Sequence, residues 1–337
     1  MKFEKNVKLS SYNTMRIGGF AKNLCVVFSE QDLITALKFA NDNKLNIFIL
    51  GKGSNTVFTD NGFDGLVIIN SLMGVDINLK QNTIEAGSGE NWDKIVDIAV
   101  KNNLVGIEAL SLIPGTIGAA PVNNIGAYGQ EIKDTVILVR AYDLQNKKFI
   151  ELTNSECKFN YRNSIFKSTS YGRYIITKVI LKLKPYNAAT YCPPAYPSLQ
   201  NELLKLNNKA DLKDVRNAVI KVRTSKLPDP EIIANTGSFF KNPIVSTDFA
   251  ETLKIKYPEI PVYEFGNDKK IAAGWLIEKA GLKGYEKDGI EIYSKQSLVL
   301  VNRSANNYQA LKNMIDLITL KVYEMYGIKL EPEPEII

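Results

Sequence analysis

The chain has 337 residues, of which 45% are apolar, and this length predicts two or three domains with sizeable cores. Its 42 basic and 36 acidic residues leave a net charge of +6. Because the two kinds are interspersed, the sequence shows no basic stripe for binding nucleic acid and no polybasic membrane anchor. The absence of histidine excludes Ser–His–Asp triads, Cys–His pairs and histidine metal sites, and three widely spaced cysteines fit a reducing compartment better than a disulfide framework or a zinc site.

The first half of the chain predicts alternating strands and helices. Residues 1–15 lack the apolar core of a signal peptide, and no apolar run approaches the roughly 20 residues that span a bilayer, so we expect a cytoplasmic protein. Ser29 is placed to cap a helix over residues 30–41, where apolar side chains recur at helical spacing. Strands are predicted at 24–28, 46–50, 65–70 and 84–89, and a second amphipathic helix at 92–102.

The second half predicts a hairpin and then mainly helices. The hairpin pairs residues 136–143 with 148–152, and a strand follows at 174–183. Residues 186–199 are rich in proline and tyrosine and indicate a loop or lid, and a proline-rich break at 227–230 indicates a domain boundary. Helices are predicted at 199–206, 212–224, 247–256, 272–280 and 308–326, a loop up to residue 268, and a strand at 297–302.

Residues 109–129 form a long glycine-rich segment without a single charged side chain. Glycine lacks a Cβ, so backbone N–H groups in such a segment can approach a flat, partly polar ligand closely. Thr116, Asn123 and Asn124 add short hydrogen-bonding groups. A buried crossover loop explains the pattern equally well.

Residues 51–55, GKGSN, follow a predicted strand and form a phosphate-binding candidate. Two glycines and the side chains of Ser54 and Asn55 can make a nest for a pyrophosphate. The segment is neither a Rossmann fingerprint nor a P-loop, because it lacks the third glycine and a closing Gly-Lys-Ser/Thr. A simple turn between two strands is the alternative.

Two side chains in apolar surroundings are candidates for chemistry. Arg162 lies between aromatic residues and can clamp a carboxylate with its planar fork, or form a structural ion pair. Ser238 precedes two phenylalanines, and its hydroxyl can act in a tight apolar site or simply cap a turn. Lys226 can neutralise a phosphate, although lone lysines are mostly solvated.

The C-terminal sequence LEPEPEII places three carboxylates at alternate positions. Glu331, Glu333 and Glu335 would share one face of an extended segment. Because apolar residues flank them, we expect a strand packed back on the body of the protein, with a solvated end as the alternative.

Taken in order, the motifs NTMRIGG, ILGKGSN, LIPGTIGAAPVNNIGAYG, FNYRNSIFK, KLPDP, NTGSFFKNP, AAGWLIEKAGLKG and LVLVN resemble the UDP-N-acetylenolpyruvoylglucosamine reductase (MurB) family, in its longer type I form. The resemblance covers nearly the whole chain. It implies an α+β fold with a two-lobed FAD-binding domain of the vanillyl-alcohol-oxidase (PCMH) type and a C-terminal α/β substrate-binding domain. The implied lobes are residues 1–70 and 71–226, with 328–337 returning to the second lobe, and the substrate domain is 227–327.

The resemblance also implies an activity: NADPH-dependent, FAD-mediated reduction of UDP-N-acetylglucosamine enolpyruvate in peptidoglycan precursor synthesis, by a monomer with non-covalent FAD, no metal, no nucleic acid and no membrane insertion. The implied catalytic residues are Arg162, which binds the substrate carboxylate, Ser238, which donates a proton, and Glu333. The implied FAD-binding residues are Gly51, Lys52, Gly53, Ser54, Asn55, Ile113, Pro114, Gly115, Thr116, Gly118, Ala119, Asn124, Gly126, Ala127 and Tyr128. The implied substrate-binding residues are Tyr161, Tyr196, with Tyr191 as its alternative, Lys226, Asn242 and Gln296.

The C-terminal tail departs from the family pattern. The family ending Pro-Glu-Val-Arg is replaced here by Pro-Glu-Pro-Glu, with Pro334 removing a backbone donor and Glu335 reversing a charge. Glu331 is the substitute for Glu333 if the tail is shifted by two residues. Two other functions stay open at this point: a different FAD-dependent oxidase or dehydrogenase, and a flavin- or UDP-sugar-binding protein without catalysis.

Overall fold

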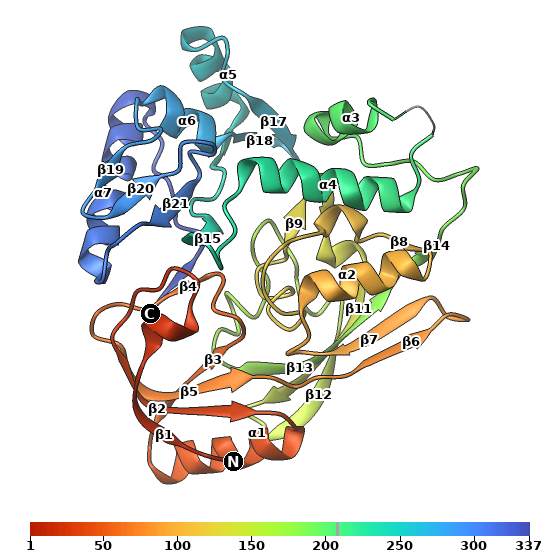
Figure 1. Cartoon of the computed structure of the whole chain (residues 1–337), viewed down its shortest axis with the longest axis vertical. Coiled ribbons are helices and arrows are strands. Elements are labelled where there is room, and N and C mark those ends of the chain that lie inside the picture. Colours follow the sequence, from red (N-terminus) through yellow and green to blue (C-terminus); the bar gives the residue numbers. More distant parts are fainter. Residues whose placement is uncertain (207–208) are drawn as a thin grey trace. The chain divides into compact units, whose positions relative to one another are not determined.

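The computed structural model describes residues 1–206 and 209–337, and the chain divides into two compact units (Figure 1). The first unit comprises Met1–Val7, Lys22–Lys52 and Asp64–Ser225. The second comprises Lys8–Ala21, Gly53–Phe63 and Lys226–Ile337. The GKGSN segment is therefore divided between them. No helix in the described ranges is long and apolar enough to cross a membrane.

The N-terminal part of the first unit is a four-stranded sheet covered by one helix. The strand order is β1 (Glu4–Lys8), β2 (Phe20–Val27), β5 (Phe63–Asn70) and β3 (Asn46–Leu50). Helix α1 (Glu30–Asp42) is capped by the Ser29 side chain, which accepts a hydrogen bond from the Asp32 N–H, as predicted. Its buried face, including Leu33, packs with Leu66 and Ile68 of the sheet.

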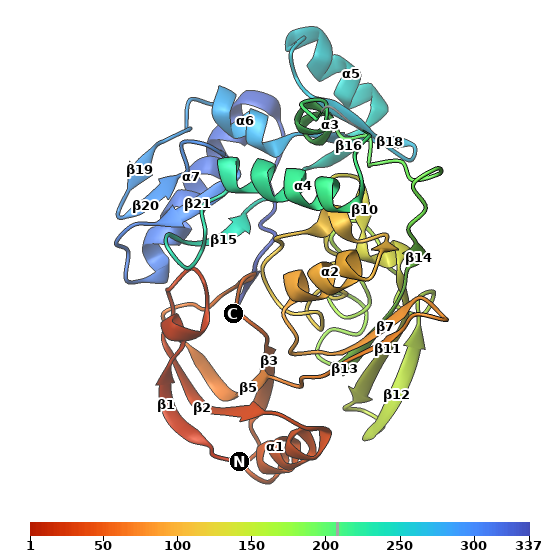
Figure 2. The same ribbon diagram turned by 45° about the vertical axis from the view of Figure 1, so that its right-hand side comes forward.

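A five-stranded antiparallel sheet forms the rest of the first unit's framework. Its order is β12 (Lys148–Thr153), β11 (Val136–Asp143), β13 (Tyr174–Lys182), β7 (Thr83–Gly87) and β6 (Val75–Asn78). Helices α2 (Trp92–Lys101) and α4 (Leu212–Lys226) lie side by side in both views (Figures 1 and 2). Trp92 and Val219 belong to the apolar core shared with this sheet.

Short elements complete the first unit. Strand β8 (Leu104–Val105) pairs with β14 (Lys184–Pro185), and β9 (Gly126–Ala127) pairs with β10 (Gln130–Glu131). Helix α3 (Pro197–Leu203) follows the proline- and tyrosine-rich segment. In the described ranges, 3₁₀ helices span Glu108–Leu110 and Ile132–Asp134 of this unit and Leu9–Tyr12 of the second.

The second unit combines a four-stranded, a three-stranded and a two-stranded sheet with three helices. The four-stranded sheet has the order β15 (Ala234–Ser238), β21 (Val299–Asn302), β20 (Ile290–Ile292) and β19 (Glu286–Lys287), and the three-stranded sheet has β16 (Ile244–Ser246), β18 (Asp268–Ile271) and β17 (Val262–Phe265). The helices are α5 (Thr247–Lys256), α6 (Ala273–Lys279) and α7 (Tyr308–Tyr326). The C-terminal strand β22 (Glu335–Ile336) pairs in parallel with β4 (Thr56–Val57).

Most predicted elements are confirmed, with differences of a few residues at their ends. One prediction is wrong: the expected loop before residue 268 contains the hairpin of β17 and β18. Helix α3 also starts earlier than predicted, with Pro197 in its first turn. Proline is well suited to that position because the first N–H groups of a helix have no internal partner. The lobe boundaries expected from the resemblance stay a prediction.

Candidate active site

The charge-free segment of the first unit is held by a continuous set of hydrogen bonds from residues 88–93. The Gly118 N–H donates to the Ser88 carbonyl at 2.9 Å, and the Ile117 N–H donates to the Glu90 carbonyl at 2.9 Å. Further along, the Trp92 indole N–H donates to the Leu110 carbonyl at 2.9 Å. Residues 88–92 thus fix the backbone path of residues 110–118, the first half of the segment.

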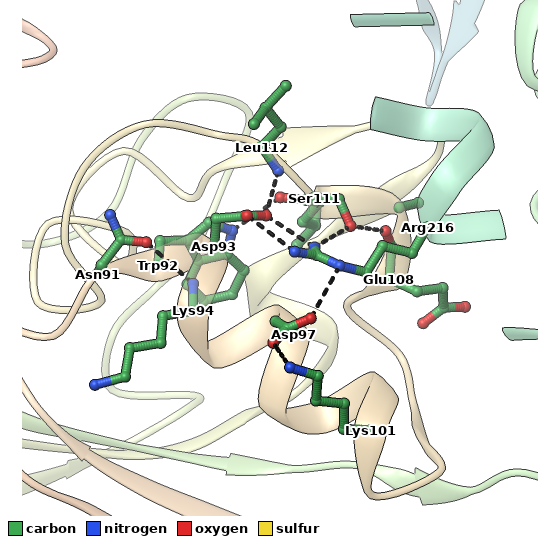
Figure 3. Close-up of polar contacts among 12 residues, drawn as sticks. Asn91, Trp92, Asp93, Lys94, Asp97, Lys101, Glu108, Ser111, Leu112 and Arg216 are labelled. Atoms are coloured by element: carbon green, nitrogen blue, oxygen red, sulfur yellow. Dashed lines mark hydrogen bonds and ion pairs between the residues drawn. The ribbon is translucent and has the colours of Figure 1, made fainter. Parts of the chain in front are cut away.

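An ion-pair network secures the start of α2 (Figure 3). Asp93 accepts from both terminal nitrogens of Arg216, at 2.8 and 2.9 Å, and from the Leu112 N–H at 2.6 Å. Arg216 also donates to the Ser111 hydroxyl at 2.9 Å. Burial opposes ionisation of Asp93, but its bonds to Arg216 and Leu112 outweigh burial and hold the pKa of Asp93 below its ordinary value. Helix α4 is thereby tied to the glycine-rich segment.

Two glycines of this region are required by close packing within the unit. A Cβ at Gly118 would lie 2.4 Å from the Cβ of Ser88, and a Cβ at Gly51 would lie 2.9 Å from the Thr116 hydroxyl oxygen. Neither distance is compatible with a larger side chain. Gly51 and Thr116, both predicted to bind FAD, are therefore direct neighbours.

The predicted residues 124–128 meet the turn that carries Arg162. The side-chain amide of Asn124 donates to the Asn160 carbonyl and to the Glu131 carboxylate, at 3.0 and 3.1 Å. Arg162 has a left-handed backbone (φ 49°) and donates to the Gly126 carbonyl at 2.8 Å. Its guanidinium lies 5.4 Å from the Tyr161 ring centroid. Asn124 thus shapes this turn through its side chain, and Arg162 lies against the predicted cofactor segment.

Tyr128 joins two further residues to this group. Its ring meets that of Tyr196 edge-to-face at 5.2 Å, and its hydroxyl is hydrogen-bonded to Arg223 of α4. Burial raises the pKa of Tyr128 and lowers that of Arg223. The alternative tyrosine, Tyr191, is buried, whereas Tyr196 is 40% exposed.

Sequence reasoning missed Arg216 and Arg223. They are seven residues apart on α4, a spacing of about two helical turns that places them on one face. That spacing could have identified the pair from the sequence. It could not have shown that the two residues differ, since Arg216 is held by acidic partners while Arg223 lies against Tyr128.

The residues of the first unit fit a bound FAD. In the described part of the chain, the Nε of Arg223 is shielded from solvent and has no hydrogen-bond partner. A buried guanidinium N–H beside a phenol suits an electron-rich or anionic group, because an unsatisfied buried donor is costly. The neutral, hydrogen-bonded backbone of residues 113–118 suits the flat body of such a ligand.

The second unit holds the remaining part of GKGSN against the N-terminal motif. Gly53 has φ 62°, and a Cβ there would lie 2.2 Å from the Tyr12 carbonyl oxygen. The Thr14 N–H donates to the Gly53 carbonyl at 3.1 Å. Asn55 contacts the tail, because its carbonyl accepts from the Glu335 N–H at 3.0 Å. A tight glycine turn is therefore required here.

The C-terminal tail runs beside the strand of Ser238. The Glu333 N–H donates to the Phe239 carbonyl at 2.8 Å, which places Glu333 opposite Phe239, the residue after Ser238, in the second unit. Ser238 is exposed at the end of β15. Glu331 instead forms a 3.3 Å ion pair with Lys241, and its side chain is 72% exposed. The register of the tail thus favours Glu333 over Glu331 as the residue beside the serine.

The tail's prolines do not interrupt these contacts. Backbone donors come from Glu333, Glu335 and Ile337, whose N–H groups bond to the carbonyls of Phe239, Asn55 and Val57. Pro334 falls between two donors, at a position where an extended chain directs its N–H to the other side. The departure from the family ending therefore leaves the tail's hydrogen bonds intact.

The predicted substrate residues of the second unit divide into two groups. The Asn242 side-chain oxygen accepts from the Ala273 N–H at 2.9 Å, and a Cβ on Gly274 would lie 3.1 Å from the Gln296 side-chain oxygen. Asn242 and Gln296 thus both lie at the start of α6. Lys226 is exposed at the end of α4 and is not part of that group.

Comparison with known proteins matches this chain to two family descriptions: "FAD binding domain" over residues 21–152, and "UDP-N-acetylenolpyruvoylglucosamine reductase, C-terminal domain" over residues 229–337. It is 41% identical to the UDP-N-acetylenolpyruvoylglucosamine reductase of Flavobacterium johnsoniae, with 100% of both chains covered. It is 38% identical to that of Ralstonia nicotianae, covering 98% of this chain and 97% of the relative.

A solved structure of the reductase from Thermus caldophilus has the same fold, with a TM-score of 0.69 at 24% identity over 100% of this chain and 99% of that one. The predicted fold class is confirmed: a FAD-binding domain of the vanillyl-alcohol-oxidase type is followed by a C-terminal α/β domain. The chain belongs to the UDP-N-acetylenolpyruvoylglucosamine reductase (MurB) family, and it is an FAD-containing oxidoreductase.

Proposed function

We propose that this enzyme reduces the enolpyruvyl ether of UDP-N-acetylglucosamine enolpyruvate to the lactyl ether of UDP-N-acetylmuramate, with NADPH as the electron donor, for peptidoglycan precursor synthesis. The observation that carries this proposal is the backbone bond from Glu333 to Phe239, which holds Glu333 against the chain segment that carries Ser238. An FAD-binding fold alone would serve many oxidases. A serine and a glutamate held together in the C-terminal unit supply what protonation of a carbon requires.

FAD, when bound non-covalently, supplies the hydride that is added to the β-carbon of the enolpyruvyl group. We assign its binding to Gly51, Thr116 and the other predicted residues of the 51–55, 113–119 and 124–128 segments. Their contribution is a backbone held in place before the ligand arrives, so little ordering is needed on binding.

Arg162 is assigned to the substrate carboxylate. Negative charge grows on the α-carbon and the carboxylate as hydride adds, and a guanidinium placed in advance stabilises that charge without reorganisation. The contacts of Arg162 with Gly126 and Tyr161 restrict its side chain. Tyr161 and Tyr196 are assigned to the bound sugar nucleotide, along with Lys226, Asn242 and Gln296.

Ser238 is assigned as the proton donor to the α-carbon, and Glu333 as the group that assists it. The Ser238 hydroxyl provides the proton from one side of the enolate and so sets the stereochemistry of the product. Glu333, held by its own backbone, is assigned to assist as a polar group near the growing charge. Histidine is not needed for any of these steps.

A steady-state assay tests the proposal. Protein purified with its own flavin is supplied with NADPH and with or without the enolpyruvyl sugar, and the product is identified by mass spectrometry. We expect NADPH oxidation that depends on the sugar and a product heavier by two hydrogens. NADPH oxidation that ignores the sugar and follows oxygen instead would assign the enzyme to the oxidases.

A further inference from the structure

Glu108 is a buried carboxylate outside the residues assigned to the reaction. It is 1% exposed, and three neutral donors surround it. The Gly106 N–H lies 2.7 Å from one carboxylate oxygen, and the Gln130 amide and the Tyr191 hydroxyl lie 3.0 and 3.1 Å from the other. A carboxylate only accepts, so it can receive all three donors, whereas a glutamine would turn an NH₂ group toward some of them.

The donors come from segments far apart in the sequence. Gln130 belongs to β10 and pairs with Ala127 of β9. The side-chain oxygen of Gln130 accepts from the Ala109 N–H at 2.9 Å. Tyr191 belongs to the proline- and tyrosine-rich loop, residues 186–199. Glu108 therefore joins the hairpin that carries Tyr128 to this loop.

The link from Tyr191 to Tyr196 is short and stiff. Pro193 and Pro194 lie between the two tyrosines, and proline fixes φ. The Pro194 carbonyl accepts from both the Tyr196 N–H and the Gln200 side chain at 2.9 Å. Because the two prolines and these bonds limit the freedom of the intervening chain, the placement of Tyr191 restricts where the Tyr196 ring lies.

We propose that Glu108 is a positioning residue that acts through Tyr191 to hold Tyr196 edge-to-face against Tyr128, and that it thereby sets the affinity for the sugar nucleotide. The two tyrosines of the loop have separate tasks: Tyr191 is the anchor, buried and bonded to Glu108, and Tyr196 is the exposed contact residue. The substrate half of this inference rests on the proposed function. The anchoring half concerns this chain alone.

Hydrogen exchange of the flavin-loaded enzyme without substrate tests the anchoring half. Tyr191→Phe removes only the hydroxyl, and Tyr323→Phe removes one from the exposed face of α7 as the matched control. We expect exchange in peptides spanning 186–199 to rise about tenfold in Tyr191→Phe, with no change at 109–120 and none in the control. Unchanged exchange in the loop would overturn the proposal.

Kinetics test the substrate half. We expect Tyr191→Phe and Glu108→Gln to raise KM for the enolpyruvyl sugar about tenfold while kcat stays within about twofold. In a Tyr196→Ala background, Tyr191→Phe should raise KM by less than about a further twofold, because the Tyr196 ring through which Tyr191 acts is already absent. Effects that multiply would overturn the proposal. A wild-type enzyme without sugar-dependent turnover would refute the proposed function, and the exchange result would still decide the anchoring.

Discussion

The glycine-rich segment of the first unit is a succession of turns, whereas the C-terminal tail of the second is extended, and hydrogen bonds hold the two differently. Besides its backbone bonds, the segment depends on particular side chains, such as Asp93 on the Leu112 N–H, and on glycines where no Cβ fits. The tail depends on backbone groups at alternate residues. The segment should therefore be intolerant of substitution, and the tail should accept many sequences so long as its donors keep their positions.

The largest expected effect is on the reaction rate and concerns Ser238, in the strand beside which the tail runs. Ser238→Ala should leave flavin reduction by NADPH intact and slow reoxidation by the enolpyruvyl sugar by about 10²–10⁴-fold, because a proton donor is lost. Stopped-flow absorbance measures each half-reaction separately. Equal losses in the two half-reactions would remove Ser238 from the acid role.

The next effect tests the packing of the glycine-rich segment. Gly118→Ala should lower the free energy of unfolding by about 3 kcal/mol and reduce FAD content, since its Cβ would lie 2.4 Å from that of Ser88. Gly129→Ala is the matched control. Gly129 has φ 86° and no neighbour within 4 Å of a new Cβ, so only backbone strain of about 1 kcal/mol is expected. Chemical denaturation compares the two variants, and an equal cost would contradict the account.

A smaller effect comes from the Asp93 network. Asp93→Asn should destabilise the protein by about 2 kcal/mol at neutral pH, where the carboxylate accepts from Arg216 and Leu112. The pKa of Asp93 is lowered by folding, so its contribution is complete above the unfolded value of about 3.9 and is lost as pH falls through the folded value. Denaturation of both proteins across this range should show the difference shrinking in acid. If the stability difference between the two proteins grew in acid, folding would raise the pKa of Asp93 instead of lowering it, and the account would be contradicted.

The smallest effect tests the tail. Pro334→Val should change stability by less than about 1 kcal/mol, because residue 334 donates no hydrogen bond in the ladder. Glu335→Pro, one residue later, removes the N–H that bonds to the Asn55 carbonyl and should cost more. Thermal unfolding of the two variants ranks them. If Pro334→Val cost more stability than Glu335→Pro, the tail would not be held by backbone donors at alternate residues.

Much of the framework was predictable because its signals are local. Ser29 before an apolar period of 3.6 residues predicts α1, and the polar turn at 145–146 predicts the hairpin of β11 and β12. The β17–β18 hairpin was missed because its strands, VYEF and DKKI, are short, mostly half-buried or exposed, and lack an apolar alternation.

The candidate site was predictable only where residue type itself carries the chemistry. Glycines, Arg162 and Ser238 stand out in the sequence, and the structure gives each a defined setting. The roles of Arg216 and Arg223 depend on contacts across more than 90 residues, with Asp93 and Tyr128, which no local pattern contains. Equally, only the tail's register shows that Glu333 bonds to Phe239 while Glu331 pairs with Lys241.

The most direct measurement is an anaerobic absorption titration of the purified protein. The account predicts a flavin spectrum that bleaches on addition of NADPH and recovers fully on addition of one equivalent of UDP-N-acetylglucosamine enolpyruvate. Recovery would show that the altered tail, with Pro334 and Glu335, supports the complete reaction. A spectrum that bleaches but stays bleached after the sugar is added would contradict the central claim, because the flavin would then pass its electrons to something else.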